Sequence, residues 1–138
     1  MRNISIFTDG GSRGNPGQAG IGVYIKDDER TITQIGKRIG VETNNVAEYK
    51  AVIEALTWIS ENKENLEDTS INFFMDSQLI YSQIVGLYKI KNEILRSLLY
   101  KVREKEAEIK LPISYNYIPR EQNKNADGLV NMALDNIL

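Results

Sequence analysis

The sequence predicts a single α/β domain over residues 1–138, with helices flanking a five-stranded mixed sheet. Two observations lead to this fold class. Three alternating apolar segments come first, and after them short apolar runs alternate with stretches of helical periodicity. Hairpins followed by β–α alternation are typical of a sheet in which two parallel strands are added to three antiparallel ones. A chain of 138 residues is long enough to bury such a core.

The first half of the chain predicts an antiparallel meander and then a helix. Alternation predicts strands at residues 3–8, 21–25 and 32–41; the first ends at Asp9, and a polar turn at 27–30 joins the other two. Six of the ten glycines lie within residues 10–22. The polar residues 43–45 are suitable helix caps, and the helical spacing of apolar residues predicts a helix over 45–61.

The second half predicts two further strands and three helices. These are a strand at 71–75 that ends at Asp76, a short helix over 79–87, a long helix over 93–109, a strand over 112–118 and a final helix over 125–136. A polar loop at 119–125 precedes the final helix. No internal repeat or linker is visible, so we expect one domain.

Composition excludes several kinds of chemistry. The chain has no cysteine and no histidine, which excludes disulfides, thiolate catalysis and cysteine metal sites and removes the commonest general base. Acid–base or metal chemistry must therefore use carboxylates, lysine, tyrosine, serine or threonine, and carboxylate oxygens suit Mg²⁺, Mn²⁺ or Ca²⁺. No signal peptide or membrane span is visible, so we expect a cytoplasmic protein without a membrane partner.

Charge is uneven along the chain although the net charge is only −2. Residues 87–124 contain nine cations and five anions, a local balance of +4. Two interpretations are open: a side that faces phosphates, or a solvated helix with paired charges. Charge alone favours the solvated helix.

Four acidic residues, Asp9, Glu48, Asp76 and Asp127, occupy strand ends or helix starts, where side chains converge on one edge of an α/β sheet. Each also has a structural explanation. Asn45 and Glu48 match a capping box, and Asp76 could cap the helix after it. Asp127 could favour its helix start through the dipole, and Asp9 could be a turn residue. Spacing alone leaves both interpretations open.

The glycine-rich segment at 10–17 also has two interpretations. Its backbone N–H groups could cradle a phosphate, or it could be a bare turn between strands. It is neither a P-loop nor a dinucleotide fingerprint, because no Gly-Lys-Ser/Thr follows it and a strand rather than a helix comes next. Its position directly after Asp9 favours a turn that faces a substrate.

Four segments together resemble motifs of the type 1 ribonuclease H (ribonuclease HI) family. They are Thr-Asp-Gly-Gly-Ser-Arg-Gly-Asn-Pro-Gly at 8–17, Thr-Asn-Asn-Val-Ala-Glu-Tyr at 43–49, Asp-Ser-Gln at 76–78 and Asn-Lys-Asn-Ala-Asp at 123–127. They stand in the family's order and span nearly the whole chain. The resemblance implies a ribonuclease H-like fold, and we expect a free-standing monomer.

The resemblance also implies the chemistry and the substrate. Asp9, Glu48, Asp76 and Asp127 would hold two Mg²⁺ ions, for which Mn²⁺ could substitute, with Asp9 bridging them. The RNA strand of an RNA–DNA hybrid would be hydrolysed internally to 5′-phosphate and 3′-hydroxyl ends. The implied substrate-binding residues are Gly11, Ser12, Asn15, Thr43, Asn44, Asn45, Gln78, Lys89, Lys91, Asn92, Arg120 and Asn123.

Different parts of the hybrid are assigned to these residues by the same resemblance. Asn45, Gln78 and the backbone of Gly11 and Ser12 would contact RNA sugars, whose 2′-hydroxyl distinguishes RNA from DNA. Thr43 and Asn92 would form a pocket for a phosphate of the DNA strand. Lys89 and Lys91 would add attraction that is independent of sequence.

The sequence departs from the best-known bacterial pattern of the family in two places. Arg120 stands near the position of a loop histidine, and arginine cannot act as a base at neutral pH. A basic protrusion is missing, and only residues 86–92 bridge the two helices there. Two alternatives remain: a catalytically silent module that binds hybrids or duplexes, and another Mg²⁺ phosphotransferase. The presence of all four acids disfavours the first, and the meander after Asp9 disfavours the second.

Overall fold

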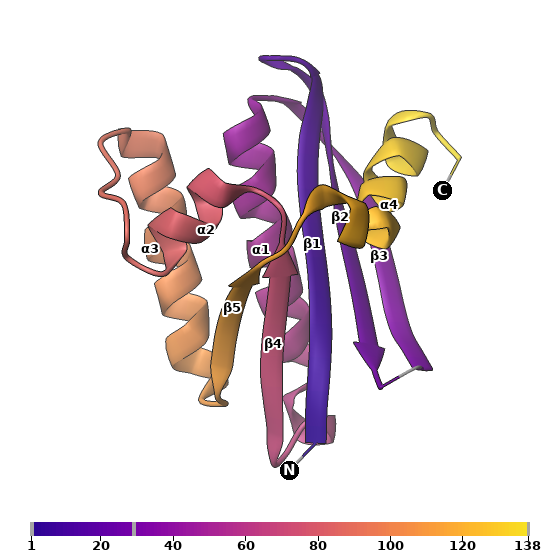
Figure 1. Cartoon of the computed structure of the whole chain (residues 1–138), viewed down its shortest axis with the longest axis vertical. Coiled ribbons are helices and arrows are strands. Elements are labelled where there is room, and N and C mark those ends of the chain that lie inside the picture. The colour runs from indigo at the N-terminus through magenta and orange to yellow at the C-terminus, as the bar shows by residue number, and fades with distance from the viewer. Residues whose placement is uncertain (1, 29, 138) are drawn as a thin grey trace.

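The computed structural model describes residues 2–28 and 30–137 (Figure 1). Its strands are β1 (Arg2–Gly14), β2 (Gly17–Asp27), β3 (Arg30–Glu42), β4 (Thr69–Met75) and β5 (Ile113–Tyr117). Its α-helices are α1 (Asn44–Glu61), α2 (Gln78–Ile84), α3 (Glu93–Ile109) and α4 (Lys124–Leu134), with 3-10 turns at Lys63–Asn65 and Arg120–Gln122. α3 has the predicted bounds, and the other elements differ from prediction by a few residues at their ends, apart from β1.

The sheet has the predicted mixed topology. Its strand order is β3-β2-β1-β4-β5. β2 pairs antiparallel with β1 and with β3, whereas β4 pairs parallel with β1 and β5 pairs parallel with β4. The α/β fold predicted for residues 1–138 is therefore confirmed for the described residues.

Helices cover the two faces of the sheet unequally (Figure 1). α1 packs on β1 and β2 with α3 against it, and α4 packs on β1, β2 and β3. A side chain at Gly10 of β1 would meet Ala47 of α1, whereas one at Gly22 of β2, which pairs with Asp9, would meet Ala126 of α4; neighbouring residues of a strand, such as Asp9 and Gly10, point to opposite faces. α1 and α4 therefore lie on opposite faces. The core between α1, α3 and the sheet contains fully buried Ile6, Leu56 and Phe73.

The predicted end of the first strand at Asp9 is wrong. β1 continues past Asp9 to Gly14, which pairs with Gly17 of β2, so that only Asn15 and Pro16 form the turn. Glycine density indicated a loop, but most of these glycines stand within paired strands. The adjacent turn predicted at 27–30 includes residue 29, which lies outside the described residues.

Two structural explanations that the sequence left open for the acids are not realised. Thr43 caps α1 by accepting a hydrogen bond from the backbone N–H of Val46, so the capping box of Asn45 and Glu48 does not form, and Glu48 lies in the second turn. Ser77, not Asp76, caps α2. Both acids are thereby free of the structural roles that the sequence left open. Among the described residues, no helix is long and apolar enough to span a membrane.

Candidate active site

A cavity of about 390 Å³ brings all four predicted acids together. It is lined by Asp9, Gly10, Gly11, Ser12, Arg13, Asn44, Asn45, Glu48, Asp76, Ser77, Arg120, Asp127, Val130, Asn131 and Leu134. These residues come from β1, the start of α1, the end of β4, and the loop and helix that close the chain. The convergence predicted from strand ends and helix starts is therefore present in the structure.

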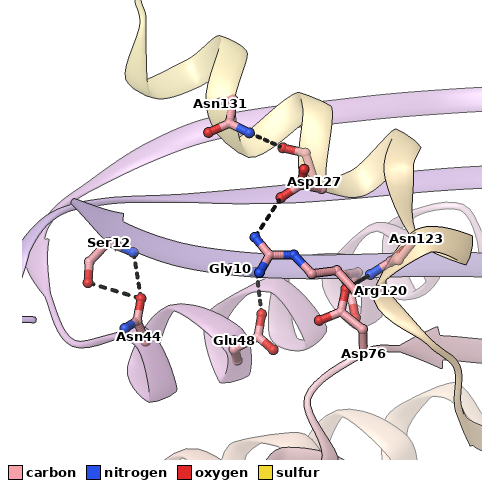
Figure 2. A network of polar contacts seen from close by, with 10 residues as sticks. Gly10, Ser12, Asn44, Glu48, Asp76, Arg120, Asn123, Asp127 and Asn131 are labelled. Atoms are coloured by element: carbon pink, nitrogen blue, oxygen red, sulfur yellow. Dashed lines mark hydrogen bonds and ion pairs between the residues drawn. The ribbon is translucent and has the colours of Figure 1, made fainter. Parts of the chain in front are cut away.

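Asp9, Glu48 and Asp76 form the tightest part of the site. Asp9 and Asp76 follow paired positions of the neighbouring parallel strands β1 and β4. Glu48 joins them because α1 lies against β1 at Gly10, whose backbone N–H donates to the Glu48 carboxylate (Figure 2). One carboxylate oxygen from each of the three acids lies within 4.8 Å of the others.

Burial and the charges of neighbouring carboxylates raise the pKa values of Asp9 and Glu48. Burial raises the pKa of Asp9 to about 7, with a further contribution from the charge of Asp76. Burial also raises the pKa of Glu48 well above its usual value, and the charge of Asp9 adds to this. Both causes disfavour the charged form, and a bound divalent cation would reverse both effects. An all-oxygen set of three carboxylates fits a hard cation such as Mg²⁺ or Mn²⁺.

Asp127 reaches the cavity from the other face of the sheet. It lies in the first turn of α4, as predicted, and its Oδ1 is 3.9 Å from Nη2 of Arg120. α4 approaches β2 very closely, because a Cβ at Gly22 would stand 2.2 Å from the carbonyl oxygen of Ala126. Glycine at this position therefore allows α4 to place Asp127 beside the cavity.

Asn123 has a different position from the substrate contact predicted for it. Its side chain is 1% exposed and lies beneath the site. Its Nδ2 donates to the carbonyl oxygen of Thr8 at 2.9 Å. The same Nδ2 donates to Oδ2 of Asp76 at 2.8 Å (Figure 2). These bonds join the residue before Asp9 to the carboxylate of Asp76. Asn123 therefore positions Asp76, a role that no pattern in the sequence indicates.

Five of the other predicted contacts line the cavity: Gly11, Ser12, Asn44, Asn45 and Arg120. Asn44 Oδ1 accepts from both the N–H and the hydroxyl of Ser12 (Figure 2), and the N–H of Asn44 donates to Oδ1 of Asn15. These bonds tie the β1–β2 hairpin to the start of α1. Asn15 therefore does not line the cavity itself but helps to hold Asn44, which does.

The five remaining predicted contacts do not line this cavity. Thr43 and Asn92 are the N-caps of α1 and α3, and Gln78 is an exposed residue at the start of α2. Lys91 is exposed, and Lys89 lines a separate cavity along α3. The structure does not bring these five residues into the cavity of the acids.

The cation-rich segment is partly neutralised within α3. Arg103 pairs with Glu106 and Lys105 pairs with Glu108, each three residues apart. This favours the solvated helix with paired charges for α3. Residues 10, 13, 77, 130, 131 and 134 line the cavity without having been predicted. Arg13 was missed because β1 extends beyond the alternating apolar residues from which the strand was predicted.

Comparisons with known proteins assign the family. A family model described as reverse transcriptase-like matches residues 7–133. The ribonuclease HI of Halobacterium salinarum is 36% identical over 133 residues, which cover 96% of this chain and 64% of the archaeal protein. The chain belongs to the ribonuclease H family.

Two further relatives extend the comparison. LC11-RNase H1, isolated from compost by a metagenomic approach, is 44% identical with a TM-score of 0.93, over 99% of this chain and 98% of the other. The same protein has been solved in complex with an RNA/DNA hybrid, with a TM-score of 0.91 and 43% identity over 96% and 97% of the two chains. The bifunctional protein Rv2228c of Mycobacterium tuberculosis is 37% identical over 96% of this chain, which spans 35% of that protein.

Proposed function

We propose that this ribonuclease H domain hydrolyses the RNA strand of RNA–DNA hybrids internally, with two divalent ions, and leaves 5′-phosphate and 3′-hydroxyl ends. The observation that carries the proposal is the convergence of Asp9, Glu48, Asp76 and Asp127 on one cavity. A relative with 43% identity, LC11-RNase H1, forms a complex with an RNA/DNA hybrid, which supports the choice of substrate.

The four acids are the residues that would hold Mg²⁺ or Mn²⁺. When bound, such ions lower the pKa of a water molecule and stabilise the departing oxygen, and the chain has no histidine to act as the general base instead. Asp9, Glu48 and Asp76 form the group of three, and Asp127 lines the same cavity, so all four would supply carboxylate ligands. Asn123 holds Asp76 in place for this role.

The cavity wall supplies the groups that recognise RNA. Asn45 and the backbone of Gly11 and Ser12 line the cavity beside the acids. Amides and backbone N–H groups can donate to or accept from a 2′-hydroxyl, which DNA lacks. Arg120 lines the same cavity and is 82% exposed, so it can contact a phosphate but cannot remove a proton at neutral pH. Little base readout is expected, because these groups face sugars and phosphates.

A labelled RNA–DNA hybrid tests the proposal. We expect the RNA strand to be cut with Mg²⁺ or Mn²⁺ and to stay intact with EDTA, and we expect duplex DNA to stay intact. Asp9→Asn should bind the hybrid and keep its thermal transition but not cut. A hybrid that is bound yet intact with every metal would favour the silent binding module, and a hybrid that is neither bound nor cut would refute both.

A further inference from the structure

One face of β1 carries a regular series of three residues into the cavity. Asp9, Gly11 and Arg13 alternate along the strand, so their side chains share a face, and all three line the cavity. Four residues of β-strand separate Asp9 from Arg13 by about 13 Å. Arg13 therefore stands well beyond the carboxylates, at the far end of the same wall.

The middle position of this series carries no side chain. A Cβ built at Gly11 would stand 3.9 Å from Asn44 Oδ1 and 4.0 Å from Val130 Cγ1, in ordinary van der Waals contact, so glycine leaves a shallow gap between these two side chains. The strand surface between Asp9 and Arg13 is thus low enough for a ligand backbone to pass over it. This arrangement suits a nucleic-acid strand that lies along β1. Its reacting phosphate would lie at Asp9, its backbone would pass over Gly11, and a later phosphate would reach Arg13.

The charges around the cavity also favour a phosphate contact at Arg13. The cavity is lined by four acids and only two cations, Arg13 and Arg120. A polyanionic ligand needs cations beyond the metal site, because neutralising its phosphates supplies much of its affinity. The Arg13 guanidinium can offer a bidentate fork to a phosphate.

We propose that Arg13 binds a phosphate of the RNA strand away from the cut, and that Asp135 competes with this phosphate for the guanidinium. The proposal rests on the proposed function, since it extends the same substrate along β1. Arg13 Nη1 lies 2.6 Å from Oδ1 of Asp135, and the two side chains are 50% and 46% exposed. An exposed pair of this kind is weak, so a phosphate can displace Asp135 at small cost.

Two substitutions with opposite expected effects test the competition. Arg13→Gln should raise KM for the hybrid on the order of tenfold with little change in kcat. Arg13→Gln should also reduce the slope of log Kd against log salt concentration by about 1, the amount expected for one lost phosphate contact. Hybrid binding is measured in the Asp9→Asn background. Asp135→Asn frees Arg13 and should tighten binding about twofold.

Matched variants separate this effect from net charge. Arg38→Gln removes an exposed arginine of β3 whose side chain bonds Asn136 and which does not line the cavity. Asp27→Asn removes an acid that pairs with Arg2 at the other end of β1. Both controls should leave KM and the salt dependence near wild type. Equal effects of Arg13→Gln and Arg38→Gln would overturn the proposal.

A phosphate scan assigns the contact. Hybrids carry a single neutral methylphosphonate at successive positions of the RNA strand. Wild type and Arg38→Gln should lose on the order of tenfold in affinity at one position away from the cut, and Arg13→Gln should lose nothing there. Equal losses in all three proteins at every position would overturn the contact while leaving the proposed function intact. Failure of wild type to bind or cut any hybrid would instead refute the proposed function, and the contact with it.

Discussion

Gly10→Ala tests whether the close approach of α1 to β1 builds the site. The new Cβ would lie 2.3 Å from the backbone carbon and oxygen of Ala47 and 2.5 Å from the nitrogen of Glu48. Contacts between heavy atoms are favourable near 3.5–4.0 Å, so α1 must retreat from β1 by about 1 Å. All three contacted atoms are backbone, and no side chain can turn aside to relieve the clash.

The magnitude follows from this forced shift. Overpacking of a well-packed interface costs about 1–3 kcal/mol, which for a domain of this size lowers Tm by about 3–15 °C. Glu48 moves with α1, and a 1 Å displacement of a catalytic group can cost about 100-fold in rate. Thermal unfolding in EDTA measures the first effect, and Mn²⁺ titration with hybrid cutting measures the second.

Gly128→Ala is the matched control. Gly128 lies within α4, and a Cβ there would meet no atom within 4 Å. Alanine in place of glycine inside a helix should stabilise the protein by about 0.5–1 kcal/mol. The same substitution is thus expected to have opposite signs at the two positions. An unchanged Tm and unchanged Mn²⁺ affinity for Gly10→Ala would refute the account of how Glu48 is placed.

Four further outcomes are expected. Gly22→Ala pushes α4 from β2 and should lower Tm by several degrees, measured by thermal unfolding, with loss of hybrid cutting. Asn123→Leu removes the Nδ2 group that donates both hydrogen bonds, to Thr8 and to Asp76, and should cost about 1–3 kcal/mol in urea unfolding, with weaker Mn²⁺ binding in calorimetry. Because the pKa of Asp9 is raised, the metal-free folded state keeps a proton that the unfolded state releases near pH 4. Tm measured in EDTA should therefore fall as the pH rises from 4 toward 7. Added Mg²⁺ should restore Tm, and Asp9→Asn should make Tm less dependent on pH. Arg120→Ala should slow turnover without abolishing it, and complete loss of cutting would show a larger role.

Patterns of side-chain spacing predicted the fold well. The long helix α3 has the predicted bounds because its apolar stripe is regular and its cap, Asn92, is a strong one. The parallel and antiparallel pairings followed from the order of hairpins and β–α units. Motif order was decisive for the site, because each acid alone had an ordinary structural explanation.

Features that depend on contacts between distant segments could not be predicted. The glycines of β1 and β2 looked like a loop, whereas their function is to let α1 and α4 approach the sheet, as at Gly10 and Gly22. The bond from Asn123 to Asp76 joins residues 47 positions apart. Local spacing carries no information about either contact, since both depend on how the helices dock.

The acids of the site differ in how firmly the protein holds them, and the one held least firmly, Asp127, is the one that contacts Arg120. Glu48 accepts from the backbone of β1, and Asp76 accepts from a buried amide. Asp127 instead pairs at 3.9 Å with Arg120, which is 82% exposed, and such a pair contributes about 0–1 kcal/mol. Asp127 can therefore turn from Arg120 toward a cation at little cost. Arg120 therefore contacts an acid that is held less firmly than Glu48 or Asp76.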